Sequence, residues 1–309
     1  MPQTLLLSRF FSISLQCESI TSPQAYHKRL IKMNTKKVLF ITQEINPYVE
    51  DTDMALLGRK MPQHTQEKGR EIRTFMPKWG TINERRCQLH EVIRLSGMNM
   101  IIDETDHLLI IKVASIPAAR MQVYFIDNDD YFMRRLEACD EQGNEYADNG
   151  ERTIFYARGV LETVKKLRWV PDVIHCHGWI SAMAPLYIKT SYHEEPSFRS
   201  SRVVFTPGGE HLKLPLTEQF RSSYLFKGLT GNELDEFGPV MTQTELYKLA
   251  VKYSDGLLTL PSQPHPELEE YAAACGIPVF RGGDVAEPQS LADNLAFFDQ
   301  VWSAGKAND

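Results

Sequence analysis

Short apolar runs that are rich in β-branched and aromatic residues recur along the chain, and segments of helical length separate them. The clearest runs are residues 37–42, 71–76, 172–176, 202–206 and 256–260. Such runs are typical of buried strands in a parallel sheet, because both faces of that sheet are covered. The alternation of strands with helices therefore predicts an α/β fold with a doubly wound, mostly parallel sheet.

Further elements follow from local patterns. Additional β segments are expected at 108–113, 120–126 and 277–280, and a helix over 54–68 is expected to end at Gly69. The clearest helix is 148–168, where apolar residues recur at helical spacing and Pro171 follows the last turn. Asp148 and Glu151 have the spacing of a capping box at its start.

Composition limits the class of protein. The 309 residues are 42% hydrophobic and 24% charged, and the formal net charge of −6 argues against a sequence-independent nucleic-acid binder. No apolar run reaches the roughly 18 residues of a membrane-spanning helix. The five cysteines show no pairing pattern, which fits a reducing, cytoplasmic location. We therefore expect neither a nucleic-acid partner nor a membrane.

The ends of the chain differ from its middle. Residues 1–32 lack the basic start of a secretory signal, and Met33 leads directly into the first strand. We expect 1–32 to be a disordered N-terminal extension. A single domain is then expected over 33–302, with a polar tail at 303–309.

Residues 172–179 form a strand that ends in His175, His177 and Trp179, and a helix is expected to follow at 180–189. Ligands of open α/β sheets bind outside the carboxyl ends of the strands, so this tip should line a crevice. His175 and His177 alternate along the strand and should share one face. The pair could ligate a metal, but no third ligand is visible at suitable spacing. We therefore predict no metal site and no cofactor; the alternatives are ligand-site residues or buried, hydrogen-bonded histidines.

Four segments carry a family resemblance, in the family's own order: 37–48, 68–79, 148–158 and 172–179. The last reads Asp-Val-Ile-His-Cys-His-Gly-Trp and resembles the Asp-Val-(Ile/Val)-His-x-His-Asp-Trp segment of glycogen and starch synthases, glycosyltransferase family 5. The resemblance runs from residue 37 to about residue 277. It implies the Rossmann-like N-terminal half of a two-domain GT-B enzyme, which transfers glucose from ADP-glucose or UDP-glucose to an α-1,4-glucan.

The chain departs from this family at the substrate positions. The family has Lys-x-Gly-Gly-Leu after the first strand, where backbone N–H groups and a lysine approach the pyrophosphate. Alignment on Pro47-Tyr48 places Glu50, Asp51, Thr52, Asp53 and Met54 there. Gly178 replaces a family Asp, and Gly208 and Gly209 replace a His-Asn pair. By this resemblance, the chain also ends where the C-terminal domain would begin.

The resemblance implies a candidate glucan or sugar cleft. Its residues are Tyr48, Asp148, Asn149, Arg152, His175, His177 and Trp179. Some of these residues have a plainer alternative: Asp148 as a helix cap beside a surface Arg152, and Trp179 as a core residue. The acidic segment 50–53 could hold a metal, but a solvated loop is the more common outcome. No catalytic residue is assigned.

Two classes of function remain open. The resemblance implies a hexosyltransferase of storage-polysaccharide metabolism, which we expect to be inactive alone because the substrate motifs are altered. The alternatives are a non-catalytic α-glucan-binding or regulatory module, or one half of a split synthase whose protein partner supplies the second domain. A structural protein without carbohydrate contact is a third possibility.

Overall fold

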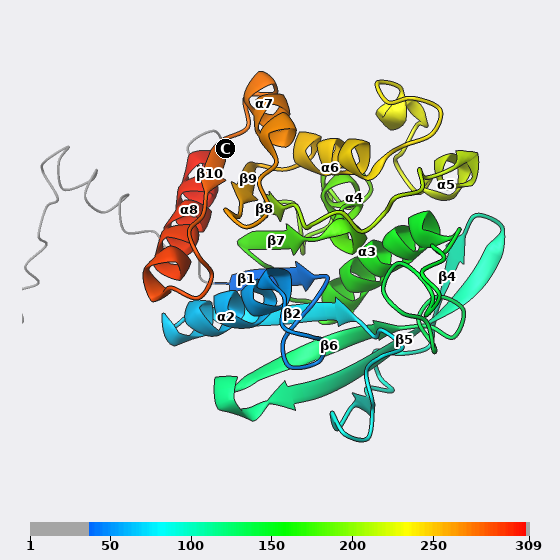
Figure 1. The fold of residues 1–309 in the computed structure, drawn as a ribbon, viewed down its shortest axis with the longest axis horizontal. Helices are drawn as coiled ribbons and strands as arrows, with labels where there is room; N and C mark the ends of the chain where they lie inside the picture. The colour runs from blue at the N-terminus through cyan, green and yellow to red at the C-terminus, as the bar shows by residue number, and fades with distance from the viewer. Residues whose placement is uncertain (1–36, 307–309) are drawn as a thin grey trace, which may run out of the picture. The chain divides into compact units, whose positions relative to one another are not determined.

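The computed structural model describes residues 37–306 (Figure 1), so the expected extension at 1–32 lies outside the described part of the chain. One sheet runs through the molecule in the order β10-β9-β8-β7-β1-β2-β6-β5-β3, with β4 paired to β5. The parallel strands are β1 (Lys37–Thr42), β2 (Glu71–Pro77), β6 (Met121–Asp127), β7 (Val173–His177), β8 (Arg202–Thr206), β9 (Gly256–Thr259) and β10 (Val279–Arg281). This confirms the predicted Rossmann-like, mostly parallel α/β fold.

The remaining strands form an antiparallel extension of that sheet. β5 (Thr105–Ile116) runs antiparallel to β6, and β3 (His90–Glu91) and β4 (Met98–Ile102) each pair with β5. The sequence predicted part of β5 but neither β3 nor β4. Buried residues in β5 are interspersed with exposed ones, as expected for a strand with one covered face.

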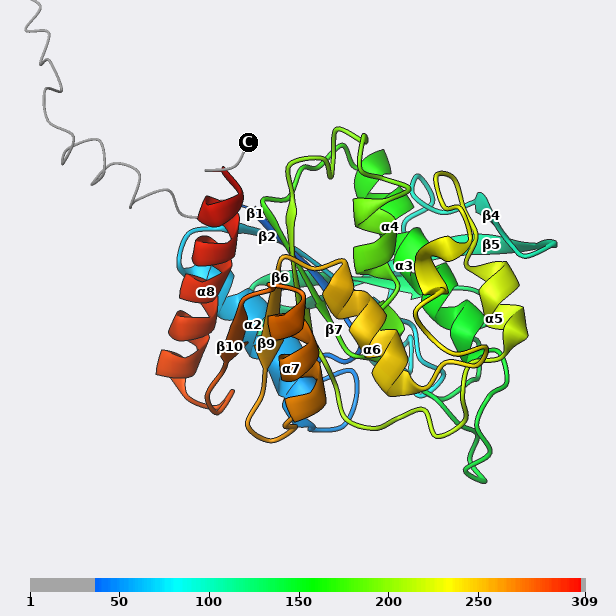
Figure 2. The ribbon, with the colours of Figure 1, turned by 90° about the horizontal axis from the view of Figure 1, so that it is seen from above.

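Helices cover both faces of the sheet (Figure 2). α2 (Asp53–Glu67) and α8 (Pro288–Lys306) pack together on one face, whereas α3 (Asn149–Lys166) and α4 (Ala184–Lys189) pack together on the other. The rest are α5 (Glu218–Ser223), α6 (Gln243–Lys252), α7 (Pro266–Ala274) and the short 3₁₀ turns η1 (Pro117–Ala119), η2 (Trp179–Ser181) and η3 (Asn232–Leu234). The helix expected over 180–189 is thus divided into η2 and α4, and α8 continues past residue 303.

The start of α3 differs from the predicted capping box. Asp148 is the N-cap residue, but its side chain makes no capping hydrogen bond. Its carboxylate instead accepts two hydrogen bonds from the guanidinium of Arg135. Glu151 accepts a hydrogen bond from the hydroxyl of Tyr131 at 3.1 Å. The capping-box prediction was wrong because partners outside the helix compete for both carboxylates.

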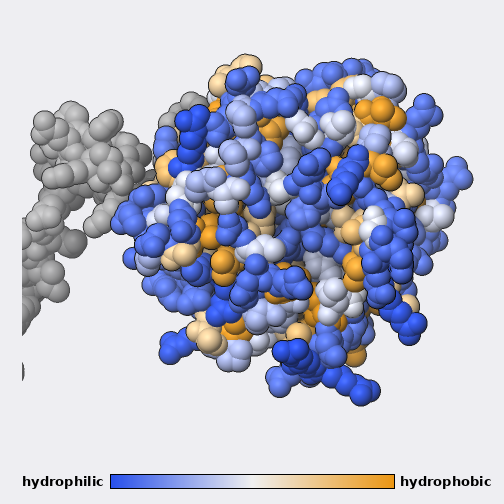
Figure 3. Space-filling view, viewed as in Figure 1, coloured by the Kyte–Doolittle hydropathy of each residue, from blue (hydrophilic) through white to orange (hydrophobic). Residues whose placement is uncertain are grey.

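The described helices include none with the length and apolar character needed to cross a membrane. The molecular face seen in Figure 1 is mostly hydrophilic, and its apolar residues form small separate groups (Figure 3).

Candidate functional site: a cleft at the carboxyl ends of the strands

A cleft of about 790 Å³ lies where the central parallel strands end. Four segments line it: the loop after β1, the loop after β2, the segment before α3 and the loop after β8. The lining residues are Glu44, Tyr48, Val49, Glu50, Thr52, Trp79, Thr81, Leu136, Glu137, Ala138, Cys139, Glu210, His211 and Lys213. Open α/β sheets bind their ligands at this edge.

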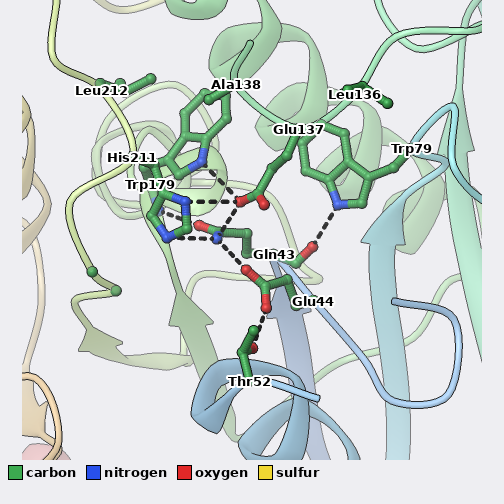
Figure 4. A network of polar contacts seen from close by, with 12 residues as sticks. Gln43, Glu44, Thr52, Trp79, Leu136, Glu137, Ala138, Trp179, His211 and Leu212 are labelled. Carbon is green, nitrogen blue, oxygen red and sulfur yellow. Dashed lines mark hydrogen bonds and ion pairs between the residues drawn. The ribbon is translucent and has the colours of Figure 1, made fainter. Parts of the chain in front are cut away.

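The side-chain amide of Gln43 joins three of these segments (Figure 4). Its Nε2 donates to Oε1 of Glu44 at 2.7 Å and to Oε1 of Glu137, and it lies 3.2 Å from Nε2 of His211. Its Oε1 accepts the backbone N–H of Trp179 at 2.9 Å, which fixes the orientation of the amide. The buried Gln43 amide therefore holds together the loop after β1, the segment before α3 and the loop after β8, and we call these three segments the wall of the cleft.

Two tryptophans and a threonine complete this network. The indole of Trp79 donates to the backbone carbonyl of Gln43 at 3.0 Å, and that of Trp179 donates to Oε1 of Glu137 at 3.3 Å. The two indoles stack with ring centres 6.3 Å apart. The hydroxyl of Thr52 donates to Oε2 of Glu44. Each carboxylate thus has a donor beyond the Gln43 amide.

Burial changes the protonation of this cluster. Loss of hydration raises the pKa of Glu137 from 4.5 to about 8, and the negative charge of Glu44 contributes further. Burial lowers the pKa of His211, against an opposing effect of Glu44. At neutral pH we therefore expect a protonated Glu137 carboxyl beside a neutral His211.

Glu44, Glu137 and His211 also have the ligand types of a metal site, with atoms within 4.8 Å of one another. The Gln43 amide nitrogen contacts all three groups, and an N–H donor cannot ligate a cation. The arrangement therefore favours protonation of this cluster over the binding of a metal ion. Sequence reasoning missed these residues, although Gln43 and Glu44 directly follow the first strand.

His175 and His177 lie beneath the cleft rather than in its wall. Both are fully buried, and their rings stack with centres 5.2 Å apart, which confirms that they share one face. Nε2 of His175 bonds the hydroxyl of Thr206 at 2.8 Å, whereas neither ring nitrogen of His177 has a partner among the described residues. Burial lowers the pKa of His175 to about 3 and lowers that of His177 as well, so both rings are neutral.

The predicted aromatic residues occupy different positions. Trp179 is fully buried, as the core interpretation expects, and reaches the cleft only through Gln43 and Glu137. Tyr48 lines the cleft, and its ring packs edge-on against Phe125 at 4.9 Å.

Arg152 is fully buried, so the alternative of a surface arginine was wrong. Its guanidinium donates to the backbone carbonyls of Tyr131, Leu136 and Glu137 and to Oδ1 of Asn149. Asn149 in turn donates to the carbonyl of Ala138 at 2.8 Å. The predicted Asp148–Arg152 group therefore shapes the segment that carries Glu137, and the polar atoms of Asn149 and Arg152 are used within the chain.

The segment that the resemblance aligns with the family's Lys-x-Gly-Gly-Leu motif leads into the N-terminus of α2. Oγ1 of Thr52 accepts the N–H of Ala55 at 2.9 Å, and Asp53 adds a carboxylate to the first turn. Glu50 and Asp51 are exposed, and Asp51 accepts a hydrogen bond from Asn46. The chain's own groups thus occupy a helix end that could otherwise bind an anion.

Gly178, Gly208 and Gly209, the glycines at positions where the resemblance predicts other residues, differ in how closely neighbouring atoms approach them. Gly178 has a φ of 83°, and a Cβ there would lie 2.5 Å from Cβ and 2.8 Å from Cδ of Gln43. A Cβ at Gly208 would lie 3.4 Å from Cα of Gly178 and from the hydroxyl of Tyr247, whereas Gly209 has more space. The Gln43 side chain therefore fills the space that a residue 178 side chain would enter.

Comparisons with known proteins agree with this architecture. The family model for the starch synthase catalytic domain matches residues 37–263. Glycogen synthases of Chlorobium luteolum and Pelodictyon phaeoclathratiforme are each 40% identical to the chain over 171 residues, which is 55% of this chain and 35% of each relative. A solved structure, the catalytic domain of Starch Synthase IV from Arabidopsis thaliana bound to ADP and acarbose, matches with a TM-score of 0.61 at 19% identity.

That structural match covers 86% of this chain and 50% of the plant chain, and it supports the fold alone at this identity. The chain spans about a third of the length of the curated relatives it matches. The family model, in contrast, covers most of the chain from the start of β1. The chain belongs to the starch synthase catalytic domain family, glycosyltransferase family 5, and spans the N-terminal part of it.

Proposed function

We propose that the chain acts in storage-polysaccharide metabolism by binding α-glucan or malto-oligosaccharide in this cleft, as a non-catalytic module. The acidic lining is the observation that carries the proposal. Glu44, Glu50, Glu137 and Glu210 line the cleft, whereas Lys213 is the single Lys or Arg among the described lining residues. This balance favours a neutral ligand over a nucleotide diphosphate.

The start of α2 argues against a nucleotide-sugar donor. Thr52 caps the helix with its own side chain, and the neighbouring carboxylates repel a second anion. Repulsion between like charges in a cleft disfavours such a ligand by several kcal/mol. Transfer also requires cations where negative charge develops on the leaving diphosphate, and Lys213 alone offers little of that stabilisation.

The lining suits a polyhydroxylated, uncharged ligand. Carboxylate oxygens accept hydrogen bonds from hydroxyl groups, and a protonated Glu137 carboxyl can also donate one. Tyr48 and Trp79 also line the cleft, but both side chains are buried, so they form part of its floor and offer little stacking surface to a ligand. The known relatives are glycogen synthases, which makes an α-glucan the natural candidate.

Glucosyl transfer, the family reaction, is the second candidate, because the cleft lies at the sheet edge where α/β enzymes place their sites. A partner polypeptide that supplied the missing cations would make the chain one half of a split synthase. Transfer from ADP-glucose or UDP-glucose to glycogen by the chain alone would favour an active enzyme. Transfer only with such a partner would favour the split form.

Calorimetric titration with maltoheptaose tests the proposal. We expect binding in the millimolar range or tighter, weakened in Glu210→Ala and His211→Ala because both side chains line the cleft. Glu194→Ala is the matched control, since that side chain is 88% exposed and lies outside the cleft. A chain that binds no maltoheptaose contradicts the glucan proposal.

A further inference from the structure

We propose that one proton on Glu137 closes the wall of the cleft, and that its loss at alkaline pH opens this wall and weakens α-glucan binding. This regulatory role rests on the proposed glucan-binding function. Figure 4 shows the contacts that would carry it: the Glu137 carboxyl group meets Gln43, Trp179 and His211 at one point.

The charged and titratable groups around Glu137 come from several elements. Glu44, in the loop after β1, faces it across the Gln43 amide, and Nδ1 of His211, in the loop after β8, lies 3.3 Å from its Oε1. Arg152 of α3 and Tyr247 of α6 are the other groups close enough to interact with its charge. The remaining titratable residues that line the same cleft are Tyr48, Glu50, Cys139, Glu210 and Lys213.

The closeness of two carboxylates is the geometric reason for a proton on Glu137. The Gln43 amide has two N–H protons but contacts three groups, which are Glu44, Glu137 and a nitrogen of His211. With Glu137 ionised, two negatively charged carboxylates with oxygens within 4.8 Å would repel each other across the Gln43 amide. The raised pKa of Glu137 agrees with a bound proton at neutral pH.

The position of Glu137 links this proton to the cleft. Arg152 anchors its backbone carbonyl on the inner side, so the backbone of this segment is held in place. The side chain keeps 29% of its surface exposed and can turn toward the cleft when repelled by Glu44. His211 then loses its contact with Glu137, and the two lining segments separate.

Titration of maltoheptaose binding from pH 6.5 to 9.5 tests the proposal. For the wild-type chain, the dissociation constant should rise by up to about tenfold per pH unit once Glu137 ionises. Glu137→Gln keeps a neutral donor and should bind with little pH dependence. Glu151→Gln is the matched control: burial also raises the pKa of Glu151, but that residue lies outside the cleft, so its variant should behave as wild type.

The outcomes separate this inference from the proposed function. Absence of maltoheptaose binding at every pH overturns both, whereas equal pH dependence in wild type and Glu137→Gln overturns the proton-dependent wall alone. Carbon-13 NMR of the glutamate carboxyl groups adds a measurement on the unaltered chain. One carboxyl that titrates above pH 7 and is absent from Glu137→Gln supports the inference; titration of every carboxyl below pH 6 contradicts it.

Discussion

Gly178 and Gln43 fit together as a pair. The amide of Gln43 holds Glu44, Glu137 and the backbone of Trp179, and it can do so only because residue 178 has no side chain. An Asp side chain at position 178, which the resemblance predicts for other family members, and the Gln43 amide would therefore exclude each other in this backbone.

The first prediction concerns this pair. Gly178→Asp should destabilise the chain by about 2–4 kcal/mol, because the φ of 83° is strained for a side chain and Cβ meets Gln43. Adding Gln43→Gly should recover part of that loss by removing the clash, although the φ strain stays. Urea unfolding of both variants measures this, and equal stability of the single and double variants would refute the steric account.

The second prediction concerns Arg152. Arg152→Met should cost about 3–5 kcal/mol, because it removes the donors to the buried carbonyl of residue 131 and the partly buried carbonyls of residues 136 and 137. The exposed Arg199 provides the control, and Arg199→Met should change stability by no more than about 0.5 kcal/mol. Similar unfolding midpoints for the two variants would show that Arg152 does not organise the segment before α3.

At the scale of elements, local sequence predicted β1, β2, α2, α3, β7, β8 and β9 to within a few residues. These elements have strong apolar patterns, so the local sequence is enough to predict them. β3 and β4 were missed because they form only by pairing with β5. The capping box predicted at Asp148 was wrong for a related reason: Arg135, which binds the Asp148 carboxylate, lies outside the local helix pattern.

The candidate site was harder to predict than the fold. Tyr48 and the altered loop at Glu50 and Thr52 line the cleft, but His175 and His177 lie beneath it. Gln43, Glu137 and His211 come from segments far apart in the sequence, and only the folded chain brings them together. Glu137 and His211 lie outside the four family-like segments, and Gln43 lies within segment 37–48 but was not singled out there.

A third prediction belongs to helix α2. Thr52→Ala should destabilise the chain by about 1 kcal/mol, because the N-cap hydrogen bond from the N–H of Ala55 is lost. Thr52→Gly should cost less, on the order of a few tenths of a kcal/mol. Thermal unfolding of the two variants measures the difference. If Thr52→Gly proves the more damaging change, the cap is not what stabilises this helix end.

At the scale of the whole molecule, Glu137 should make stability depend on pH. Its pKa is raised from 4.5 to about 8 in the folded chain, so the folded state keeps a proton that the unfolded state releases. The resulting stabilisation is complete below about pH 4.5 and is lost as the pH rises through 8. Compared with wild type, Glu137→Gln should therefore gain melting temperature as the pH increases from 5 toward 9. If the difference in melting temperature between Glu137→Gln and wild type stayed constant across that range, Glu137 would not hold a proton at neutral pH.

We propose that the cleft of this chain binds an α-glucan and does not bind a nucleotide sugar. Calorimetric titration of one protein sample with maltoheptaose and with ADP-glucose, at neutral pH, tests it most directly. We expect heat of binding with maltoheptaose and none with ADP-glucose. Binding of ADP-glucose without binding of maltoheptaose would contradict it.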